Sequence, residues 1–449
     1  MSRLIVISNR IPTDEAPAGG LVFAIHEMLN RAGGLWVGTA DPGDGPTDRL
    51  TPMADGRYKR ATFALSEAEY EGYYLGYANA VLWPIFHSRR DLFTSSAGWF
   101  DAYREVNARL AGLLAAELAP DDLIWVQDYH FLPLAAELRA RGVQNRIGFF
   151  LHIPFPSTGD LDVIPQVEKL PGWLAAFDLV GLQAQRDVAN CLDFLRRSGE
   201  VEMLPQGGEL AWHDRRFAVA NFPIGIDTAA MQEAASEGYA EALRTLGSGQ
   251  KIILGVDRLD YSKGLVQRVE AFGRLLDHPA HRARRPTYLQ IAPASRENIS
   301  AYGEIRAHLD QMAGSVNGTH AELDWTPIRY VRKNFPRDVI AGLYRRADIA
   351  LVTPLADGMN LVAKEYVAAQ DPENPGVLIL SRFAGAAEQL DGALIVNPYD
   401  PQDIADALAR AITMSAEERL SRFTDMLPGV MERDIAWWGR SFLERLQAL

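Results

Sequence analysis

The chain has 449 residues and a formal net charge of −13 at pH 7. Such a length predicts about two to three domains, and the 48% share of hydrophobic residues is ordinary for a globular protein. An acidic chain lacks the basic face that nucleic acids and anionic membranes require, so we expect neither as a partner. The single cysteine, Cys191, excludes an internal disulfide and a cysteine-based zinc site.

The cellular compartment is predicted from the cysteine count and the apolar runs. One cysteine fits a reducing compartment. The N-terminus goes directly into a strand-like pattern without a signal-peptide pattern, and the longest apolar runs are too short to cross a membrane. We therefore expect a soluble, cytoplasmic protein. The residues do not decide its oligomeric state, so a homo-oligomer stays open.

Apolar strand-like runs alternate with helix-period segments in two series, which predicts an α/β fold with mostly parallel sheets. The first series has strands at 4–7, 123–126, 147–151 and 179–182, with a helix at 131–141. The second has strands at 252–256, 288–291, 349–352, 377–380 and 393–396. The segment 221–227 separates the series and predicts domains at 1–226 and 227–434. The amphipathic segment 435–449, with Trp437, Trp438 and Phe442, is a predicted helix that joins the first domain.

Polar side chains follow six of the predicted strands. Ligands of open α/β sheets bind at this edge, where loops leave the sheet and helix N-termini direct their N–H groups outward. Capping or ion pairing explains any one of these residues, but the set as a whole favours ligand sites. Two domains that present such edges to each other would form a cleft suited to phosphorylated substrates. The residues are Arg10, Asp128 with His130, His152, Arg258 with Lys263, Arg296, and Asp357.

The first of these loops starts with SNRIP and returns through AGG. Arg10 ends the first strand, and Gly19 and Gly20 start the next helix, where the backbone can approach a ligand closely. A plain strand-to-helix turn is the alternative interpretation. No GxGxxG follows a strand, which leaves a dinucleotide-dependent dehydrogenase as a distant alternative.

The second series carries two further motifs. DRLDYSKG places Arg258 and Lys263 five residues apart, enough to bracket a diphosphate, although a solvated charge cluster has the same pattern. In LADGMNLVAKE, packing alone would make Gly358 a turn residue and Asn360 an N-cap. The functional interpretation is that free N–H groups near 361–362 bind phosphate and Glu365 accepts hydrogen bonds from a ribose diol.

With these residues the chain resembles the trehalose-6-phosphate synthases, a family of retaining glycosyltransferases with two facing Rossmann-like domains (the GT-B fold). The resemblance covers essentially the whole chain. It implies transfer of glucose from a nucleotide sugar, usually UDP-glucose, to glucose 6-phosphate. It also implies that no trehalose-phosphatase domain is present. The motifs are SNRIP, AVLWPIFH, WVQDYHFLP, NRIGFFLHIPFP, VDRLDYSKGL, IAPASR, DGMNLVAKEYVAAQDP and FAGAA.

The resemblance also implies roles for individual residues. The acceptor phosphate and sugar would be held by Arg10, Tyr74, Trp83, Asp128 and Arg296. The donor would be held by Gly19, Gly20, Arg258, Lys263, the backbone near Phe335, Asp357, and the run Met359, Asn360, Leu361, Val362, Ala363, Lys364 and Glu365. His152 and Asp357 would hold hydroxyls of the transferred glucose, and with Arg258 and Lys263 they form the expected catalytic set.

Neither a cofactor nor a metal is expected. No carboxylate pair with acid and base spacing is recognisable, whereas cations for a leaving diphosphate are present. Enzymes of this kind are thought to retain the anomeric configuration without a covalent intermediate, with the leaving diphosphate helping to deprotonate the acceptor on the same face.

Three positions depart from the family pattern. Thr39 stands where a second tryptophan is usual, Ala356 where arginine is common, and Gln127 where many members have histidine. Two alternatives to a trehalose-6-phosphate synthase therefore stay open. One is a related retaining transferase with another phosphorylated or polyol acceptor, and the other is a catalytically silent sugar-phosphate sensor. The nucleotide base of the donor stays open as well.

Overall fold

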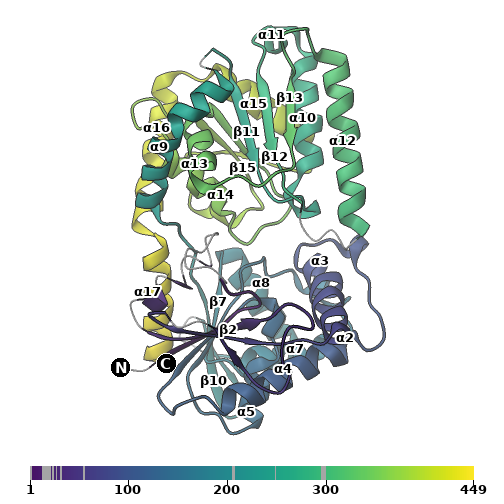
Figure 1. Cartoon of the computed structure of the whole chain (residues 1–449), viewed down its shortest axis with the longest axis vertical. Helices are drawn as coiled ribbons and strands as arrows, with labels where there is room; N and C mark the ends of the chain where they lie inside the picture. The colour runs from purple at the N-terminus through teal and green to yellow at the C-terminus, as the bar shows by residue number, and fades with distance from the viewer. Residues whose placement is uncertain are drawn as a thin grey trace. The chain divides into compact units, whose positions relative to one another are not determined.

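The chain divides into two units. One comprises Met1–Pro223 with Ala436–Leu449, and the other comprises Ile224–Ile435. The structure is a computed structural model that describes residues 3–12, 22, 25–26, 28–30, 33–53, 56–204, 208–247, 249–294 and 300–449, the side chains of Ser300 and Ala301 excepted. Figure 1 labels the helices and strands by their positions in the chain.

Within the described residues, the first unit forms a ten-stranded sheet in the order β3-β4-β2-β1-β5-β6-β7-β10-β9-β8. Neighbours from β4 to β10 pair in parallel, whereas the outer pairs are antiparallel. Fully buried apolar runs form β1, β5, β6 and β7, as expected for strands that are covered on both faces. The strands are β1 (Leu4–Ile7), β2 (Gly34–Thr39), β3 (Thr51–Pro52), β4 (Lys59–Phe63), β5 (Leu123–Gln127), β6 (Ile147–Phe150), β7 (Leu179–Leu182), β8 (Glu202–Met203), β9 (Glu209–Trp212) and β10 (Arg215–Asn221).

A π-helix, η1 (Tyr70–Leu82), distinguishes the helical part of the first unit. It is 13 residues long, although π-helical turns are mostly single. Gly76 allows it to pack closely, because an added Cβ would lie 2.5 Å from the Trp99 ring. The other helices are α2 (Glu67–Glu69), α3 (Trp83–Phe86), η2 (Arg90–Leu92), α4 (Trp99–Ala115), η3 (Tyr129–Phe131), α5 (Leu134–Ala140), α6 (Thr158–Leu161), η4 (Val167–Lys169), α7 (Leu170–Ala175), α8 (Gln185–Ser198) and α17 (Ile435–Ala448).

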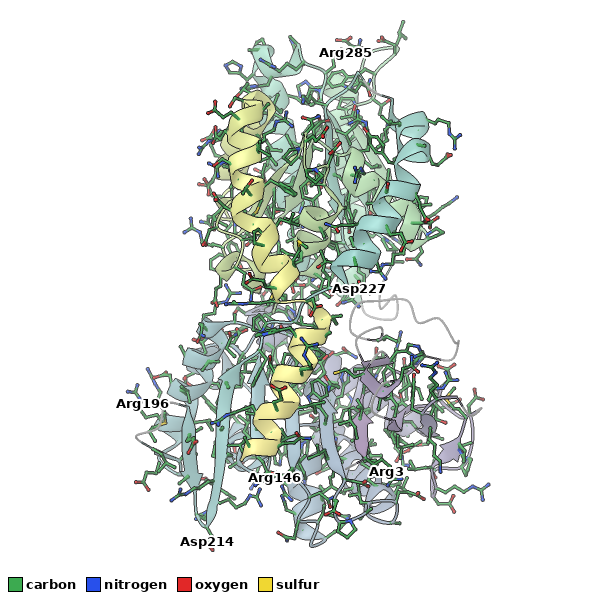
Figure 2. The ribbon with its side chains drawn as sticks, turned by 90° about the vertical axis from the view of Figure 1, so that its left-hand side faces the viewer. Arg3, Arg146, Arg196, Asp214, Asp227 and Arg285 are labelled. Carbon is green, nitrogen blue, oxygen red and sulfur yellow. The ribbon has the colours of Figure 1, made fainter. Side chains whose placement is uncertain are left out.

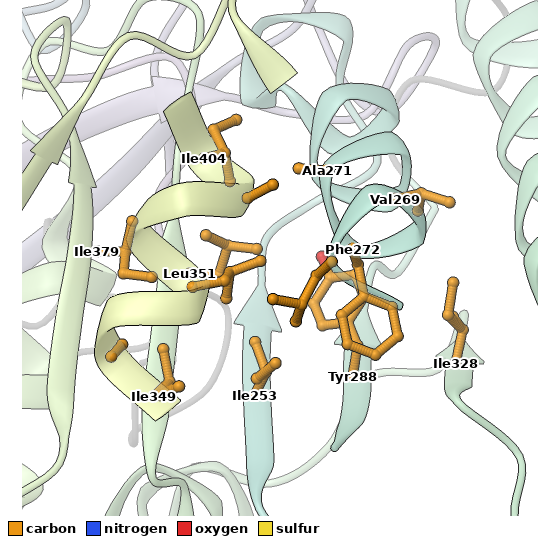
Figure 3. Close-up of a cluster of buried hydrophobic side chains, with 14 of the residues drawn as sticks. Ile253, Val269, Ala271, Phe272, Tyr288, Ile328, Ile349, Leu351, Ile379 and Ile404 are labelled. Carbon is orange, nitrogen blue, oxygen red and sulfur yellow. The ribbon is translucent and has the colours of Figure 1, made fainter. Parts of the chain in front are cut away.

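The described part of the second unit forms a six-stranded, wholly parallel sheet in the order β13-β12-β11-β14-β15-β16. Its strands and helices enclose an apolar core in which the Phe272 and Tyr288 rings lie 5.6 Å apart (Figure 3). The strands are β11 (Ile252–Val256), β12 (Thr287–Ile291), β13 (Ile328–Val331), β14 (Ile349–Val352), β15 (Val377–Ser381) and β16 (Leu394–Val396). The helices are α9 (Thr228–Leu246), η5 (Tyr261–Lys263), α10 (Leu265–Asp277), α11 (Pro279–Arg282), α12 (Ser300–His320), α13 (Arg337–Arg346), α14 (Leu361–Ala369), η6 (Gly385–Glu388), α15 (Pro401–Thr413) and α16 (Ala416–Glu432).

In both sheets the strand order reverses beside the first strand of the unit. In the first sheet β2 lies on one side of β1 and β5 on the other, and in the second β12 and β14 flank β11 in the same way. Loops leave the sheet in opposite directions at such a point, which opens a crevice at the carboxyl ends of the strands. The loops after β1, β5, β11 and β14 carry Arg10, Asp128, Arg258 and Asp357.

Helix α17 completes the core of the first unit. Trp438 and Phe442 are fully buried, and their rings lie 4.9 Å and 4.6 Å from that of Trp125 on β5. Two glycines make room for Phe442, because an added Cβ at Gly148 or Gly181 would come within 2.7 Å of its ring. Figure 2 shows this helix, in yellow, crossing the strands of the unit.

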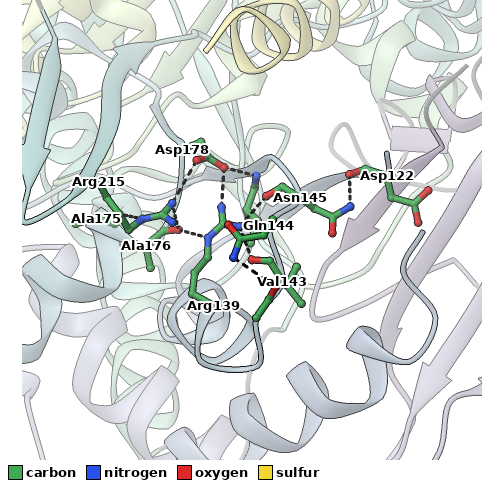
Figure 4. Close-up of polar contacts among 11 residues, drawn as sticks. Asp122, Arg139, Val143, Gln144, Asn145, Ala175, Ala176, Asp178 and Arg215 are labelled. Carbon is green, nitrogen blue, oxygen red and sulfur yellow. Dashed lines mark hydrogen bonds and ion pairs between the residues drawn. The ribbon is translucent and has the colours of Figure 1, made fainter. Parts of the chain in front are cut away.

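A polar cluster ties the amino ends of β6 and β7 together (Figure 4). Asp178 accepts hydrogen bonds from Arg139 Nη2 at 2.8 Å, from Arg215 Nη2 at 3.3 Å and from the backbone N–H of Ile147 at 2.7 Å. A buried carboxylate with several donors is satisfied, so we assign this cluster to stability. It lies at the edge of the sheet opposite to Asp128.

The predicted α/β class with mostly parallel sheets is confirmed. The predicted strands match β1, β5, β6, β7, β11, β12, β14, β15 and β16 to within one residue at either end. The helix predicted at 131–141 is shorter, because a 3₁₀ turn at Tyr129–Phe131 precedes it and Pro133, which has no N–H, stands at its N-cap. The predicted C-terminal helix corresponds to α17. Among the described residues, no helix is long and apolar enough to span a membrane.

We predict that Phe442→Ala destabilises the first unit by about 3–5 kcal/mol, because it removes a buried aromatic ring and leaves a cavity over two glycines. Urea unfolding followed by tryptophan fluorescence measures the loss. Gln447→Ala, at an exposed position of the same helix, is the control and should change stability by less than about 0.5 kcal/mol. Equal effects of the two substitutions would contradict a core role for α17.

Candidate functional site

Hydrogen bonds hold the backbone of residues 8–10 directly after β1, and the arginine at the end of this segment is exposed. Ser8 Oγ donates to the carbonyl of Arg10 at 2.7 Å and accepts from Trp36 Nε1 at 2.8 Å. Asn9 Oδ1 accepts from the Tyr73 hydroxyl at 3.2 Å. The side chain of Arg10 is exposed, and among the described residues no ion pair of its guanidinium is found. An exposed cation on a held backbone, with no ion pair in the described part of the chain, is suited to binding an anion.

Thr39, one of the departures from the family pattern, is hydrogen-bonded to the backbone that follows β1. Its backbone N–H donates to the carbonyl of Asn9 at 3.0 Å, and its hydroxyl donates to the same oxygen. The hydroxyl therefore supports the backbone beside Arg10.

Asp128 and His152 meet after β5 and β6. Asp128 has a φ of 73°, which is uncommon for a residue other than glycine. Its N–H donates to the Phe150 carbonyl at 2.7 Å, and its Oδ1 accepts from the His152 N–H at 3.3 Å. These contacts fix the backbone at the ends of two adjacent strands.

Gln127 determines which nitrogen of His152 carries the proton. His152 Nε2 lies 2.9 Å from Gln127 Oε1. An amide oxygen only accepts, so Nε2 donates and Nδ1 keeps its lone pair. Burial beside Phe150 and Trp438 lowers the pKa of His152 to about 3, so the ring is neutral at pH 7. His152 can therefore accept a hydrogen bond from a hydroxyl at Nδ1.

Tyr74 and Trp83 belong to an aromatic cluster around η1. Tyr74 stacks on His130 with ring centroids 5.8 Å apart, and the Trp83 ring lies 5.8 Å from that of Tyr129. Asn79 connects them, since its Nδ2 donates to the Tyr74 carbonyl at 2.7 Å and its Oδ1 accepts from the Tyr129 hydroxyl at 3.0 Å. The structure therefore brings Tyr74 and Trp83 to the same part of the first unit.

In the second unit, the loops after β11 and β14 are joined. Lys263 Nζ lies 2.5 Å from Asp357 Oδ2, and the Leu355 N–H donates to the Ser262 carbonyl at 2.7 Å. Gly264 has a φ of 67°, and an added Cβ would lie 2.2 Å from the Thr353 carbonyl. Only glycine permits this approach.

Arg258 lies on the first of these loops. It is exposed, and within the described part of the chain no ion pair of its side chain is found. Arg258 and Lys263 thus follow the same strand, and Lys263 is paired with Asp357.

The helix that follows Asp357 begins without a side-chain cap. Asn360 stands at the N-cap of α14 with a φ of 70°, but its side chain makes no capping hydrogen bond, so the packing-only alternative does not explain this residue. Its Nδ2 donates to Asp357 Oδ2 at 3.1 Å instead. The first-turn N–H groups of a helix have no partners within the helix, so those at Leu361 and Val362 can serve an anion.

Further along α14, the expected donor residues differ in how accessible they are. The side chain of Lys364 is buried and its Nζ donates to the Ile224 carbonyl at 2.7 Å, which leaves its backbone for the predicted donor contact. Met359 and Ala363 are buried too, which leaves their backbone for contacts, whereas Phe335 is 39% exposed.

Glu365 accepts a hydrogen bond from the Tyr344 hydroxyl at 3.3 Å. Burial raises the pKa of Glu365, and the charge of Arg337 and the Tyr344 hydrogen bond oppose this shift. The carboxylate is thus oriented by one tyrosine. Three expected site residues, Gly19, Gly20 and Arg296, lie outside the described residues.

Comparison with known proteins decides the family. The model of glycosyltransferase family 20 matches residues 6–448. The chain belongs to glycosyltransferase family 20. This family 20 chain is therefore an enzyme that transfers a glycosyl group, and the predicted resemblance is confirmed.

Named relatives of this family 20 enzyme match along its full length. A trehalose-6-phosphate synthase from Sinorhizobium fredii is 46% identical over 461 residues, which cover 100% of this chain and 99% of that protein. A UDP-forming α,α-trehalose-phosphate synthase from Burkholderia xenovorans, solved with glucose-6-phosphate, has a TM-score of 0.94 and 46% identity, covering 99% of this chain and 100% of that one. An E. coli structure bound with UDP-2-fluoro glucose has a TM-score of 0.95 and 44% identity, covering 100% and 99%.

Sequence reasoning missed the residues that hold the expected site residues in place, namely Asn79, Tyr344 and Arg268. Only Arg268 left a signal in the sequence. It stands three residues after Leu265 and one before Val269, on the face of α10 that is otherwise apolar. A charged residue at such a position requires a buried partner. In the described residues, no group of three or more His, Cys, Asp or Glu side chains is placed to hold a metal ion.

Lys364 makes a testable contribution to stability. Burial and the charge of Arg433 lower its pKa from 10.5 to about 7 in the folded protein. Between these values the unfolded chain binds a proton that the folded chain lacks, so stability rises with pH across this window, and the cost of the buried charge is fully present below pH 7.

We therefore predict that wild-type stability rises between pH 7 and pH 9 relative to that of Lys364→Met, by at most about 1.4 kcal/mol per pH unit. Urea unfolding midpoints of both proteins across this range give the comparison. Parallel pH curves would show that Lys364 keeps its ordinary pKa when folded.

Proposed function

We propose that the chain is an α,α-trehalose-6-phosphate synthase that transfers glucose from UDP-glucose to glucose 6-phosphate. The observation that carries the proposal is the full-length likeness, at 46% identity, to an enzyme solved with glucose-6-phosphate. The E. coli relative bound with a UDP-sugar supports the donor class. Arg10 after β1 and Arg258 after β11 are exposed, have no ion pair among the described residues, and supply cations for two phosphorylated substrates.

On this proposal the first unit holds the acceptor. Arg10 binds the 6-phosphate, for which a guanidinium supplies two parallel hydrogen bonds. By the family pattern, Tyr74, Trp83 and Asp128 contact the sugar and Arg296 also reaches the phosphate. Neutral His152 accepts a hydroxyl of the transferred glucose at Nδ1.

The second unit holds the donor. Arg258 and Lys263 offset the charge that develops on the leaving diphosphate, the first-turn N–H groups of α14 bind its oxygens, and Glu365 accepts from the ribose. Asp357, which pairs with Lys263 in this structure, holds a glucose hydroxyl. We propose that no metal ion is required, because two cationic side chains serve this role.

Transfer proceeds with retention of configuration. The bond between the glucose anomeric carbon and the diphosphate oxygen breaks, and the acceptor's anomeric hydroxyl oxygen bonds to the same carbon from the same face. The proton of that hydroxyl passes to the leaving diphosphate. No base from the protein is needed, which agrees with the neutral His152 being a hydrogen-bonding group.

Product analysis tests the function. The purified protein with UDP-glucose and glucose 6-phosphate should form α,α-trehalose 6-phosphate and UDP, and added EDTA should leave the rate unchanged. ADP-glucose and GDP-glucose in place of UDP-glucose identify the preferred base. Absence of the disaccharide phosphate with every donor would refute the proposal.

A second candidate is a related retaining transferase with a different acceptor. Thr39 favours this second candidate, because a threonine stands beside Arg10 where the family usually has a bulky tryptophan. The Thr39 hydroxyl is hydrogen-bonded to Asn9. A panel of phosphorylated sugars and polyols with UDP-glucose separates the candidates. A higher kcat/KM for any of these acceptors than for glucose 6-phosphate would favour the second.

For the acceptor site, we predict that Arg10→Ala weakens the binding of glucose 6-phosphate by about 10- to 100-fold, because a charge-assisted contact to the phosphate is lost. Arg10→Lys should rescue only in part, since a point charge does not reproduce the guanidinium fork. The KM for each substrate and the affinity for UDP are measured. The control, exposed Arg57→Ala, should behave like wild type. An unchanged preference for glucose 6-phosphate over glucose would place its phosphate elsewhere.

A further inference from the structure

Arg268, on the first turns of α10, is fully buried with its charge. Its guanidinium contacts four groups. Nη1 lies 2.6 Å from Asp257 Oδ2 and 3.4 Å from Gln290 Oε1. Nε donates to Thr353 Oγ1 at 2.9 Å, and Nη2 donates to the Lys263 carbonyl at 2.9 Å.

These four groups lie around the reversal of strand order in the second sheet. Asp257 directly follows β11, Thr353 directly follows β14, and Gln290 lies on β12. Lys263 ends the loop that begins with Asp257. One side chain therefore joins the carboxyl ends of the strands on both sides of the reversal.

Stability alone is a weak reason for such an arrangement. Removing a guanidinium and a carboxylate from water is costly, and well-packed apolar side chains often replace a buried ion pair without loss of stability. A buried pair is better understood through the geometry that it imposes. Here the geometry belongs to two loops, one carrying Arg258 and Lys263 and the other carrying Asp357.

Arg268 is connected indirectly to Lys263 Nζ and Asp357 through the backbone that it holds. By holding the Lys263 carbonyl, Arg268 fixes the residue whose Nζ lies 2.5 Å from Asp357. By holding Thr353, Arg268 also fixes the start of the loop after β14. Two residues later in this loop, the Leu355 N–H donates to the Ser262 carbonyl of the loop after β11. The two loops therefore keep a common position.

We propose that Arg268 is a positioning residue for the donor diphosphate, acting through Lys263 and the segment from Thr353 to Asp357. This inference rests on the proposed function, because it requires that the second unit binds a nucleoside diphosphate. Arg268 itself does not touch the ligand. It acts by holding the cation and the start of α14 at a fixed separation, so that the diphosphate meets both at once.

The structure supplies a matched control in Arg346. This side chain is also buried, and it joins the amino ends of the same strands. Nε donates to the Gly247 carbonyl at 2.8 Å, Nη2 donates to the Gln250 carbonyl at 2.8 Å, and Nη1 lies 3.1 Å from Asp348 Oδ2. Arg268 and Arg346 thus both join β11 to β14 through a carboxylate and backbone carbonyls at opposite edges of one sheet, although the Arg346 pair is less buried.

The test compares Arg268→Met and Arg346→Met. Calorimetric titration with UDP gives the donor-side affinity, and steady-state rates give KM for UDP-glucose and for glucose 6-phosphate. Both variants should lose stability. Only Arg268→Met should lose UDP affinity, by about 10-fold or more, as expected when charge-assisted contacts lose their alignment. Its KM for UDP-glucose should rise while that for glucose 6-phosphate stays within about 2-fold of wild type.

Two further variants keep the test decisive if Arg268→Met does not fold. Arg268→Lys keeps the charge but lacks the fork, so it should bind UDP with an affinity between those of wild type and the methionine variant. Asp257→Leu/Arg268→Met removes both charges and avoids an unpaired buried carboxylate. This double variant should fold and still lose UDP affinity.

The outcomes separate the two proposals. Wild-type affinity for UDP in the folded double variant, or equal losses in Arg268→Met and Arg346→Met, would overturn the positioning role and leave the proposed function intact. A wild-type protein that binds no UDP would overturn the proposed function and this inference with it.

Discussion

The reversal of strand order in a parallel sheet is the constraint on which the candidate site depends. Connections on the two sides of β1, and likewise of β11, lead away from each other, so the loops after the central strands are not covered by a helix directly above them. Polar groups at this edge can remain accessible although the strands beneath are buried. The same order in both units explains why each contributes an arginine close after its first strand, Arg10 in one and Arg258 in the other.

Net charge adds to the meaning of these two arginines. In a chain of net charge −13, some exposed arginines pair with a carboxylate, as Arg196 does with Asp193. Arg10 and Arg258 are exposed, and in the part of the chain that the structure describes no ion pair is found for either. A cation kept apart from nearby carboxylates retains its full attraction for a phosphorylated ligand.

The fold was predictable wherever apolar runs are uninterrupted. β1, β7, β11 and β14 are continuous apolar runs that are buried except at Val256, and their ends could be assigned from the sequence. β4 (KRATF) was not predicted, because it mixes charged and apolar residues at the margin of its sheet. The π-helix η1 also escaped prediction, since four tyrosines, two glycines and small residues favour no single helical period there.

For the candidate site, the sequence indicated which residues lie at the strand ends but not how their side chains are engaged. The pairing of Lys263 with Asp357 and the burial of Lys364 depend on long-range contacts that no local pattern encodes. Asn360 is a clear example. Asparagine before a helix predicts a cap, but its φ of 70° directs the amide to Asp357. Tertiary geometry prevailed over local preference.

The place of α17 in the first unit has a consequence for the order in which the protein matures on the ribosome. The aromatic side chains of Trp438 and Phe442 fill a core whose other members are translated before Pro223. While Ile224–Ile435 is synthesised, Trp125 and Phe150 of the nascent first unit therefore lack their contacts with α17. The unit translated second has its complete set of residues first, and the unit translated first is the one that needs protection from aggregation.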